Sequence, residues 1–156
     1  MLAIDIPGFK SLQIDNLVLD YNGTIACDGV VLPGVLDRIQ SLTHQLDVHV
    51  ITADTYGGVQ SELKGVQCQV SVLPPGKEDL GKLEFVRTLG AERTICIGNG
   101  RNDKLMVKEA AVGIVVCQGE GLAVESFIAA DVICTSVLDA LALLISPLRL
   151  VATLRS

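Results

Sequence analysis

One stretch decides the fold of this chain: Leu17-Val18-Leu19-Asp20-Tyr21-Asn22-Gly23-Thr24-Ile25. Its apolar beginning predicts a short buried strand, and the Asp-Tyr-Asn-Gly-Thr that follows has strong turn character. A carboxylate at the carboxyl end of a buried parallel strand lies where open α/β sheets bind ligands. Asp20 could equally form an Asx-turn onto Asn22 or Gly23, so this stretch alone leaves a structural and a functional interpretation open.

The length and composition favour one α/β domain. The 156 residues suit a single domain, and 49% of them are hydrophobic but only 3% aromatic, so the apolar content is aliphatic. Short runs rich in β-branched residues indicate strands buried on both faces of a sheet. The net charge is −6 and there is no basic stripe, which argues against a nucleic-acid partner.

Neither a membrane span nor a secretory leader is expected. No apolar run reaches the roughly 18 residues that a span needs, and the first residues lack the basic and apolar regions of a signal peptide. The five cysteines are odd in number and include no Cys-x-x-Cys pair, so we expect a reducing, cytoplasmic setting. Three of them are expected inside strands as small hydrophobes: Cys96, Cys117 and Cys134.

Strands and helices alternate along the rest of the chain. Strands are predicted at 9–14 (an edge strand), 17–20, 48–51, 67–73, 94–97, 112–116 and 131–134. Helices are predicted from Pro33 onward and at about 56–63, 77–89, 104–110, 122–128 and 137–145, with the state of the tail 148–156 open. The helix predicted at 77–89 has apolar residues spaced for one face: Leu80, Leu83, Val86 and Leu89. Residues 24–32 predict two short strands around the Asp28-Gly29 turn, a small hairpin flap.

This alternation predicts a three-layer, Rossmann-like fold over residues 1–156. Right-handed crossovers would build a mainly parallel sheet with helices on both faces. No insertion is long enough to form a second domain, so the flap would be the only addition beside the sheet.

Polar residues follow three of the predicted strands, and strand ends in such a sheet share one edge. They are Asp20 to Thr24, Thr52-Ala53-Asp54 and Gly98 to Asp103, and Lys77 and Lys82 lie near the start of a helix. Carboxylates, a hydroxyl, amides and an ammonium group together suit Mg²⁺ and phosphate. Asp20 could then attack phosphorus and form an aspartyl-phosphate.

At these residues the chain resembles the haloacid dehalogenase (HAD) superfamily. Asp20-Tyr-Asn-Gly-Thr24 resembles its first motif, Asp-x-Asp-Gly-Thr, and Ile51-Thr52 resembles its second. Lys82 resembles the third-motif lysine, and Gly98-Asn-Gly-Arg-Asn-Asp103 resembles the fourth motif, Gly-Asp-Gly-x-Asn-Asp. The resemblance covers about residues 10–145 and is greatest to the small, capless proteins named soluble P-type-ATPase-like.

The resemblance implies a role for each matched residue. Asp20 would be the nucleophile, and its carboxylate and the Asn22 backbone carbonyl would bind Mg²⁺. Asp103, with Asn99 and Asn102, would complete the metal site and orient Lys82. The phosphoryl group would be held by Thr52, Ala53, Lys82, Tyr21 and Asn22. Tyr21 could instead meet the flap or pack in the core, and Thr52 could simply cap a helix.

Two departures from the motifs imply slow turnover. Asn22 stands where the phosphatases of the superfamily have an Asp that acts as general acid and base, and an amide does not transfer protons near neutral pH. Asn99 stands where the fourth motif has an Asp that ligates Mg²⁺ directly. An amide oxygen still coordinates, but it binds the ion less well than a carboxylate does.

Two functions therefore compete. The first is a Mg²⁺-dependent phosphatase or phosphotransferase that acts through phospho-Asp20 on a phosphorylated small molecule or a phosphoprotein. The missing cap and the aliphatic composition lead us to expect a homo-oligomer. The second is a weak or inactive relative that binds phosphate, metal or a protein. Three nearby residues have interpretations that involve no function: a solvated Lys77, an exposed Arg101 and a helix-capping Asp54.

Overall fold

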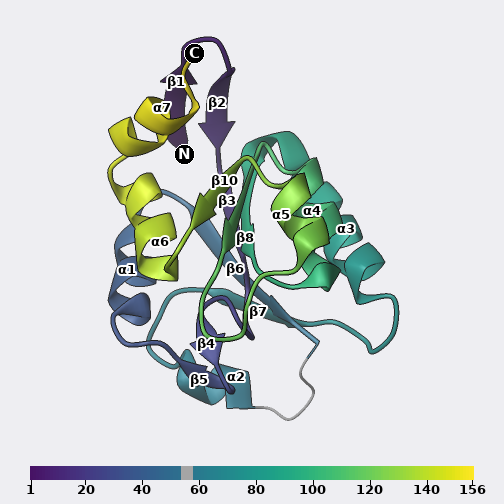
Figure 1. The fold of residues 1–156 in the computed structure, drawn as a ribbon. Helices are drawn as coiled ribbons and strands as arrows, with labels where there is room; N and C mark the ends of the chain where they lie inside the picture. Colours follow the sequence, from purple (N-terminus) through teal and green to yellow (C-terminus); the bar gives the residue numbers. More distant parts are fainter. Residues whose placement is uncertain (54–57) are drawn as a thin grey trace.

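A six-stranded parallel sheet forms the centre of the molecule (Figure 1). The computed structural model describes residues 1–53 and 58–156. The strands lie in the order β10-β9-β8-β3-β6-β7, and every neighbouring pair is parallel. Their bounds are β3 Asn16–Asp20, β6 Asp47–Thr52, β7 Gln69–Val72, β8 Thr94–Gly98, β9 Val112–Val116 and β10 Val132–Cys134. The strand that carries Asp20 is therefore central, between β8 and β6.

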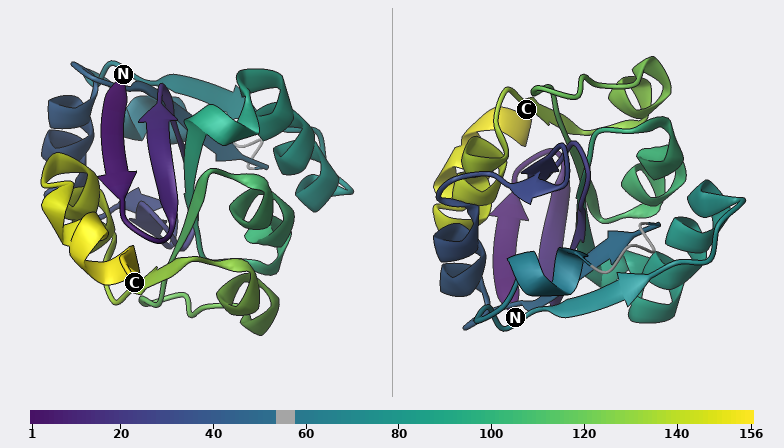
Figure 2. Two further views of the ribbon diagram at one scale, coloured as in Figure 1. Left: turned by 90° about the horizontal axis from the view of Figure 1, so that it is seen from above. Right: turned by 90° about the horizontal axis from the view of Figure 1, so that it is seen from below.

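Helices cover both faces of this sheet, as predicted. One face carries α1 (Val35–Leu42), α6 (Val137–Ile145) and α7 (Leu148–Leu154), and the other carries α3 (Glu78–Leu89), α4 (Lys104–Glu109) and α5 (Val124–Ala129) (Figures 1 and 2). The short α2 (Gly58–Glu62) precedes β7, and two 3₁₀ turns, η1 (Ala91–Arg93) and η2 (Arg101–Asp103), flank β8. The three-layer α/β fold is confirmed.

Two small antiparallel hairpins lie outside the central sheet. The flap consists of β4 (Ala26–Cys27) and β5 (Val30–Val31), which pair around the predicted turn. The strand predicted at 9–14 is β2 (Lys10–Ile14), and it pairs with β1 (Leu2–Ile6), a strand that the sequence analysis missed. Alternate residues of β1 are buried, so this hairpin packs one face on the core beneath α7.

The alternation of side chains along β3 separates two hydrophobic clusters. Leu17, Leu19 and Tyr21 belong to the larger cluster, and Val18 belongs to the smaller cluster beneath α3 and α4. Successive residues of a strand point to opposite faces, so the side chain of Asp20 points to the same face as that of Val18. Its carboxylate is thereby directed toward the face that α3 and α4 cover.

Several local predictions need correction. Helix α1 begins at Val35 with Gly34 as its N-cap, so Pro33 precedes the helix instead of opening it. Leu80 is 49% exposed, because α3 turns Lys82 and Val86 inward instead. Cys117 lies beyond β9 and is exposed.

Two further predictions concern the C-terminal tail and the residues after β6. The tail, whose state was open, forms α7. The predicted start of the helix at residue 56 and the capping role of Asp54 lie outside the described residues. In the described part of the chain no single helix is long and apolar enough to cross a membrane, although α6 and α7, bent by 106°, pass that test as a pair.

Candidate active site

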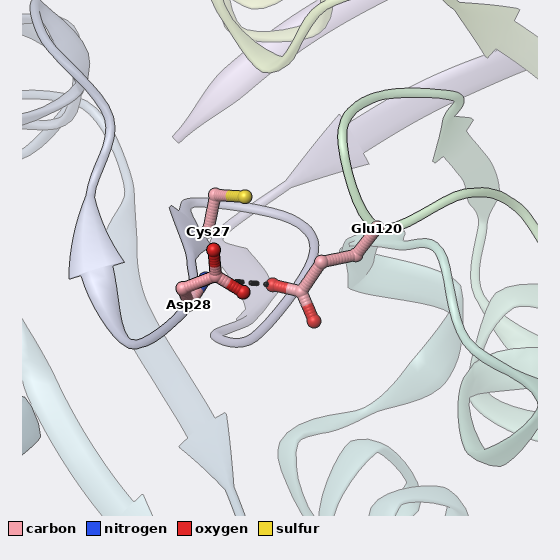
Figure 3. Close-up of side chains that lie close together, drawn as sticks. All are labelled: Cys27, Asp28 and Glu120. Atoms are coloured by element: carbon pink, nitrogen blue, oxygen red, sulfur yellow. Dashed lines mark hydrogen bonds between the residues drawn. The ribbon is translucent and has the colours of Figure 1, made fainter.

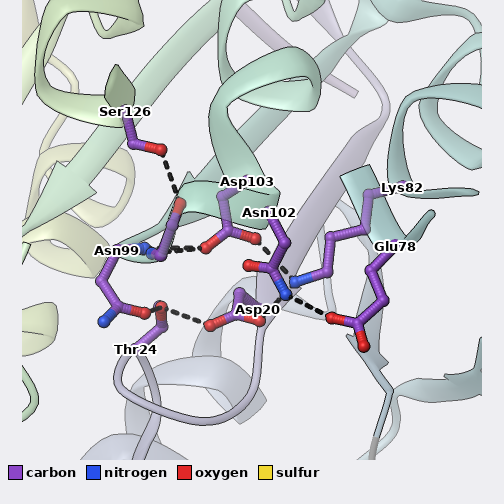
Figure 4. Close-up of polar contacts among 9 residues, drawn as sticks. Asp20, Thr24, Glu78, Lys82, Asn99, Asn102, Asp103 and Ser126 are labelled. Atoms are coloured by element: carbon purple, nitrogen blue, oxygen red, sulfur yellow. Dashed lines mark hydrogen bonds and ion pairs between the residues drawn. The ribbon is translucent and has the colours of Figure 1, made fainter. Parts of the chain in front are cut away.

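Three charged side chains meet at the carboxyl end of β3 (Figure 4). The Lys82 ammonium lies 2.5 Å from Asp20 Oδ1 and 2.6 Å from Asp103 Oδ1, and donates to both. Lys82 is 1% exposed, Asp103 0% and Asp20 6%. Asp20 and Asp103, which lie 62 and 21 positions from Lys82 in the chain, thus share one buried ammonium group. The convergence expected from the strand ends is what the structure shows.

Asp103 is fixed by the turn that contains it. Its Oδ2 accepts hydrogen bonds from the backbone N–H groups of Asn99 and Gly100, both at 2.9 Å. A Cβ atom on Gly98 would lie 2.6 Å from the Asp103 carboxyl carbon, so only glycine leaves room for that carboxylate. The glycine that ends β8 is therefore explained by the close approach of the acid.

Thr24 links the carboxyl end of β3 to the turn after β8. Its hydroxyl lies 2.9 Å from Asp20 Oδ2 and 3.2 Å from Asn99 Oδ1. The Asn99 amide nitrogen donates to the carbonyl of Gly121 at 3.0 Å. Asn99 therefore has a local role that an aspartate would not fill, because a carboxylate has no N–H to offer that carbonyl. The sequence analysis gave Thr24 no role of its own.

The charges within this cluster do not balance, and the pKa values reflect it. Burial, together with repulsion from the Asp103 carboxylate, raises the pKa of Asp20 to about 7, because the opposing effects of Lys82 and Thr24 offset only part of the rise. Burial by itself would lower the pKa of the Lys82 ammonium, but the two carboxylates outweigh burial and hold that pKa above its ordinary value. The cluster is one positive charge short of neutrality when both acids are ionised.

The free acceptor positions in the cluster suit a divalent cation. An ionised carboxylate offers about four lone-pair positions. Asp20 uses one for Lys82 and one for Thr24, and Asp103 uses one for Lys82 and two for backbone N–H groups. Two positions remain on Asp20 and one on Asp103, beside the Asn99 amide oxygen. Hard oxygen donors with excess negative charge are what Mg²⁺ prefers.

The other predicted site residues surround this cluster. Thr52 ends β6, next to β3, and is buried, Ala53 follows it half-buried, and Asn22 is exposed at the start of the loop to the flap. Tyr21 is buried in the larger cluster, and its hydroxyl donates to the carbonyl of Gly29 at 2.8 Å. This is the flap contact and the packing that the sequence left open, so a phosphate contact of Tyr21 would fall to its backbone.

Three further residues hold the site together: Asn102, which was predicted to help complete the metal site, and Ser126 and Gln118, which were not predicted. Asn102 donates to Glu78 Oε2 at 2.8 Å, and so ties η2 to the first turn of α3. Ser126 donates to the carbonyl of Gly100 at 2.6 Å. Gln118 donates to the carbonyl of Thr24 at 2.9 Å and accepts from the N–H of Val137 at 2.7 Å. Of the two that were not predicted, only Gln118 had a usable signal, as a polar residue soon after a buried strand at the same sheet edge.

A separate group of ligand-type side chains ties the flap to the loop after β9 (Figure 3). Cys27, Asp28 and Glu120 offer one thiol and two carboxylates within 4.8 Å of one another. Glu120 Oε2 accepts from the N–H of Asp28 at 3.2 Å. Both acids are exposed, so this contact fixes the flap at the surface, outside the buried cluster.

Comparisons with known proteins agree with this geometry. The chain is similar to 3-deoxy-D-manno-octulosonate 8-phosphate phosphatase from Moraxella catarrhalis, solved with magnesium ion, phosphate ion and KDO: TM-score 0.68, 17% identity, covering 85% of this chain and 86% of that one. It is also similar to a Legionella pneumophila protein assigned to subfamily III A of the HAD superfamily: TM-score 0.69, 14% identity, covering 90% and 86%. No protein-family model matches the chain.

The sheet order, the flap and these structures together define the class: the chain has the fold of the haloacid dehalogenase superfamily. Sequence similarity identifies a more specific relative. The uncharacterized protein MJ0073 of Methanocaldococcus jannaschii is 38% identical over 84 residues, which are 51% of this chain and 90% of that protein. The chain belongs to the same family as MJ0073.

Proposed function

We propose that this protein is a Mg²⁺-dependent phosphatase or phosphotransferase that acts through a phospho-aspartate on Asp20. The observation that carries the proposal is the buried Lys82 ammonium that bridges Asp20 and Asp103. A buried ion pair is seldom retained for stability alone, because desolvation offsets most of its attraction. Several of the similar solved structures are phosphatases, which supports the same conclusion.

In the proposed reaction the Asp20 carboxylate attacks the phosphorus of a phosphate monoester. A bond forms between Asp20 and phosphorus, the bond from phosphorus to the ester oxygen breaks, and the leaving alkoxide takes a proton from water. Lys82, with Thr52 and the backbone of residues 21–22 and 53, would hold the phosphoryl oxygens. Attack of water on phospho-Asp20 then releases inorganic phosphate and regenerates the carboxylate.

Mg²⁺ would be held by Asp20, the Asn22 carbonyl, Asn99 and Asp103, and the two acids have the free acceptor positions counted above. When bound it would neutralise charge on the phosphoryl group. Lys82 remains the fixed cation of the site, because the two acids hold its pKa above the ordinary value. The raised pKa of Asp20 indicates that a second positive charge favours the ionised nucleophile.

Turnover is proposed to be slow. Asn22 is exposed at the position of the general acid, and losing such a group costs about 10²–10⁴ in rate. The same observation favours the second candidate, a module that binds phosphate and metal without turning substrate over. Asn22→Asp should speed hydrolysis, and an unchanged rate would mean that residue 22 does not sit beside the leaving group.

The discriminating experiment is incubation with p-nitrophenyl phosphate or acetyl phosphate, with Mg²⁺ and with EDTA. Mg²⁺-dependent turnover that Asp20→Asn abolishes supports the enzyme. Neither turnover nor a trapped phosphoryl group on Asp20 supports the binding module. Lys108→Met, an exposed change on α4, serves as the matched control for handling and folding.

A homo-oligomer that acts on small phosphorylated molecules in the cytoplasm remains part of the proposal. The substrate class is supported by the phosphatases that share the fold. All five cysteines are free, which suits a reducing compartment. Within the described residues only the flap and the short α2 beside it lie over the carboxyl edge as separate elements, which is the reason to expect a neighbouring subunit there.

A further inference from the structure

A hollow of about 310 Å³ opens between the start of α3 and η2, beside the proposed catalytic cluster. It is lined by Gly76, Lys77, Glu78, Asp79, Arg101, Asn102 and Lys104. Asn102 belongs both to this hollow and to the group of residues around Asp20 (Figure 4). A substrate whose phosphate lies at Asp20 would therefore extend its remaining atoms past Asn102 into this space.

The lining favours a hydrophilic leaving group. Every lining side chain is charged or an amide, apart from a glycine, so a polar group would find several hydrogen-bonding partners there, whereas an alkyl or aryl group would meet only the stems of charged side chains. Two of the acids are already engaged, since Glu78 accepts from Asn102 and Asp79 accepts from the N–H of Leu80. The hollow suits a hydrophilic group that carries charge.

Of the three lining cations, Lys77 is the one free to bind a ligand. Arg101 and Lys104 both pair with Glu125, at 2.8 and 2.5 Å. Across residues 1–53 and 58–156, Lys77 makes no ion pair. Its ammonium is thus an uncommitted positive charge at the rim of the hollow.

The backbone of Lys77 gives an independent indication. Its φ is +51°, in the left-handed region that favours glycine, and among the described residues only Asp28 shares this among non-glycines. Strained backbone of this kind collects at ligand-binding positions. Lys77 also lies five residues before Lys82, about 7.5 Å along the helix axis at the usual rise, so the same helix start carries the lysine of the hollow and the lysine of the buried cluster.

We infer that this hollow binds the leaving group and that Lys77 pairs there with a second anionic group, so the substrates are compact, hydrophilic phosphate monoesters that carry a carboxylate or another phosphate. The inference rests on the proposed function, and it deepens it by naming a substrate class. Arg101 and Asn102 would line the same subsite. A charged hydrogen bond of this kind changes affinity about tenfold or more.

The test compares substrates that differ in one group. 3-Phosphoglycerate has a carboxylate where glycerol 3-phosphate has a hydroxymethyl group, and fructose 1,6-bisphosphate has a second phosphate that fructose 6-phosphate lacks. We expect kcat/KM to favour at least one anionic member about tenfold or more in the wild-type protein. Whichever pair shows the preference identifies the anion.

Lys77→Met should reduce that preference to near unity, Lys77→Arg should retain it, and Lys108→Met should leave it unchanged. A wild-type preference near unity in both pairs, or an unaltered preference in Lys77→Met, would overturn the inference. Calorimetric binding of the same pairs in the presence of Mg²⁺ separates the two proposals. If no monoester is turned over, the proposed function fails, and the binding ratio still decides the subsite by the same criteria.

Discussion

Replacement of Lys82 by methionine tests the charge arrangement that everything at the site depends on. The variant keeps the length of the side chain but leaves Asp20 and Asp103 facing each other without a counter-charge. Lys82 is 1% exposed and lies 2.5 and 2.6 Å from the two acids, so water cannot replace its ammonium. Removal of one partner from such a buried pair costs about 3–5 kcal/mol. Domains are typically stable by about 5–15 kcal/mol, so this loss is a large fraction.

Urea unfolding followed by circular dichroism would measure the loss, with Lys108→Met as the control for removal of an exposed lysine. The penalty should grow with pH, because at low pH a proton on one acid takes the place of the ammonium. The double change Lys82→Met with Asp20→Asn should recover much of the stability, since one buried charge then disappears. A loss below about 1 kcal/mol in the single variant at neutral pH would refute the reasoning.

Four further expectations follow from the site. Asp20→Asn should be more stable than the wild type at pH 8, and the difference should vanish toward pH 4. The pKa of Asp20 is raised from 3.8 to about 7, so the wild type loses stability as the pH rises through that range. Thermal unfolding from pH 4 to 9 would measure the difference, and a difference that grows on acidification would contradict the prediction. Asn99→Asp should bind Mg²⁺ more tightly in calorimetry yet lower the metal-free stability by about 1–3 kcal/mol, because the Gly121 carbonyl loses its donor; equal affinities would remove Asn99 from the metal site. Lys77→Gly should raise the free energy of unfolding by about 1 kcal/mol by relieving a positive φ, and a decrease would show that the backbone there is not strained. Light scattering at micromolar concentration should find an oligomer, and a monomer alone would end that part of the proposal.

Much of the fold could be predicted from the periodicity of hydrophobic residues and from the turn residues between the elements. The strand 112–116 and the helix 137–145 are observed at the predicted residues, because turn residues bound each run. The hairpin partner β1 was missed, although Leu2-Ala-Ile-Asp-Ile alternates, since the first residues were considered only as a possible leader. Leu80 was misplaced because a buried lysine took the inward position in α3, and hydrophobic spacing cannot foresee that.

Some residues of the site could likewise be predicted from the sequence, and others could not. Asp20, Lys82 and Asp103 could be found because the order and spacing of their motifs carry information that no single residue does. Thr24 and Ser126 could not be assigned, because their hydrogen bonds join segments far apart in the chain. The strained Lys77 was equally invisible, since a left-handed φ in a lysine leaves no trace in composition or period.

The place of β3 in the sheet also bears on how the molecule assembles. Its two partners, β6 and β8, begin at Asp47 and Thr94, so β3 stays unpaired on one edge until the residues from Thr94 onward have been made. Such long-range pairing is slow, and an unpaired apolar edge invites association with other nascent chains. Synthesis halted before β8 would therefore yield an aggregation-prone fragment that contains Asp20 and Lys82 but not Asp103.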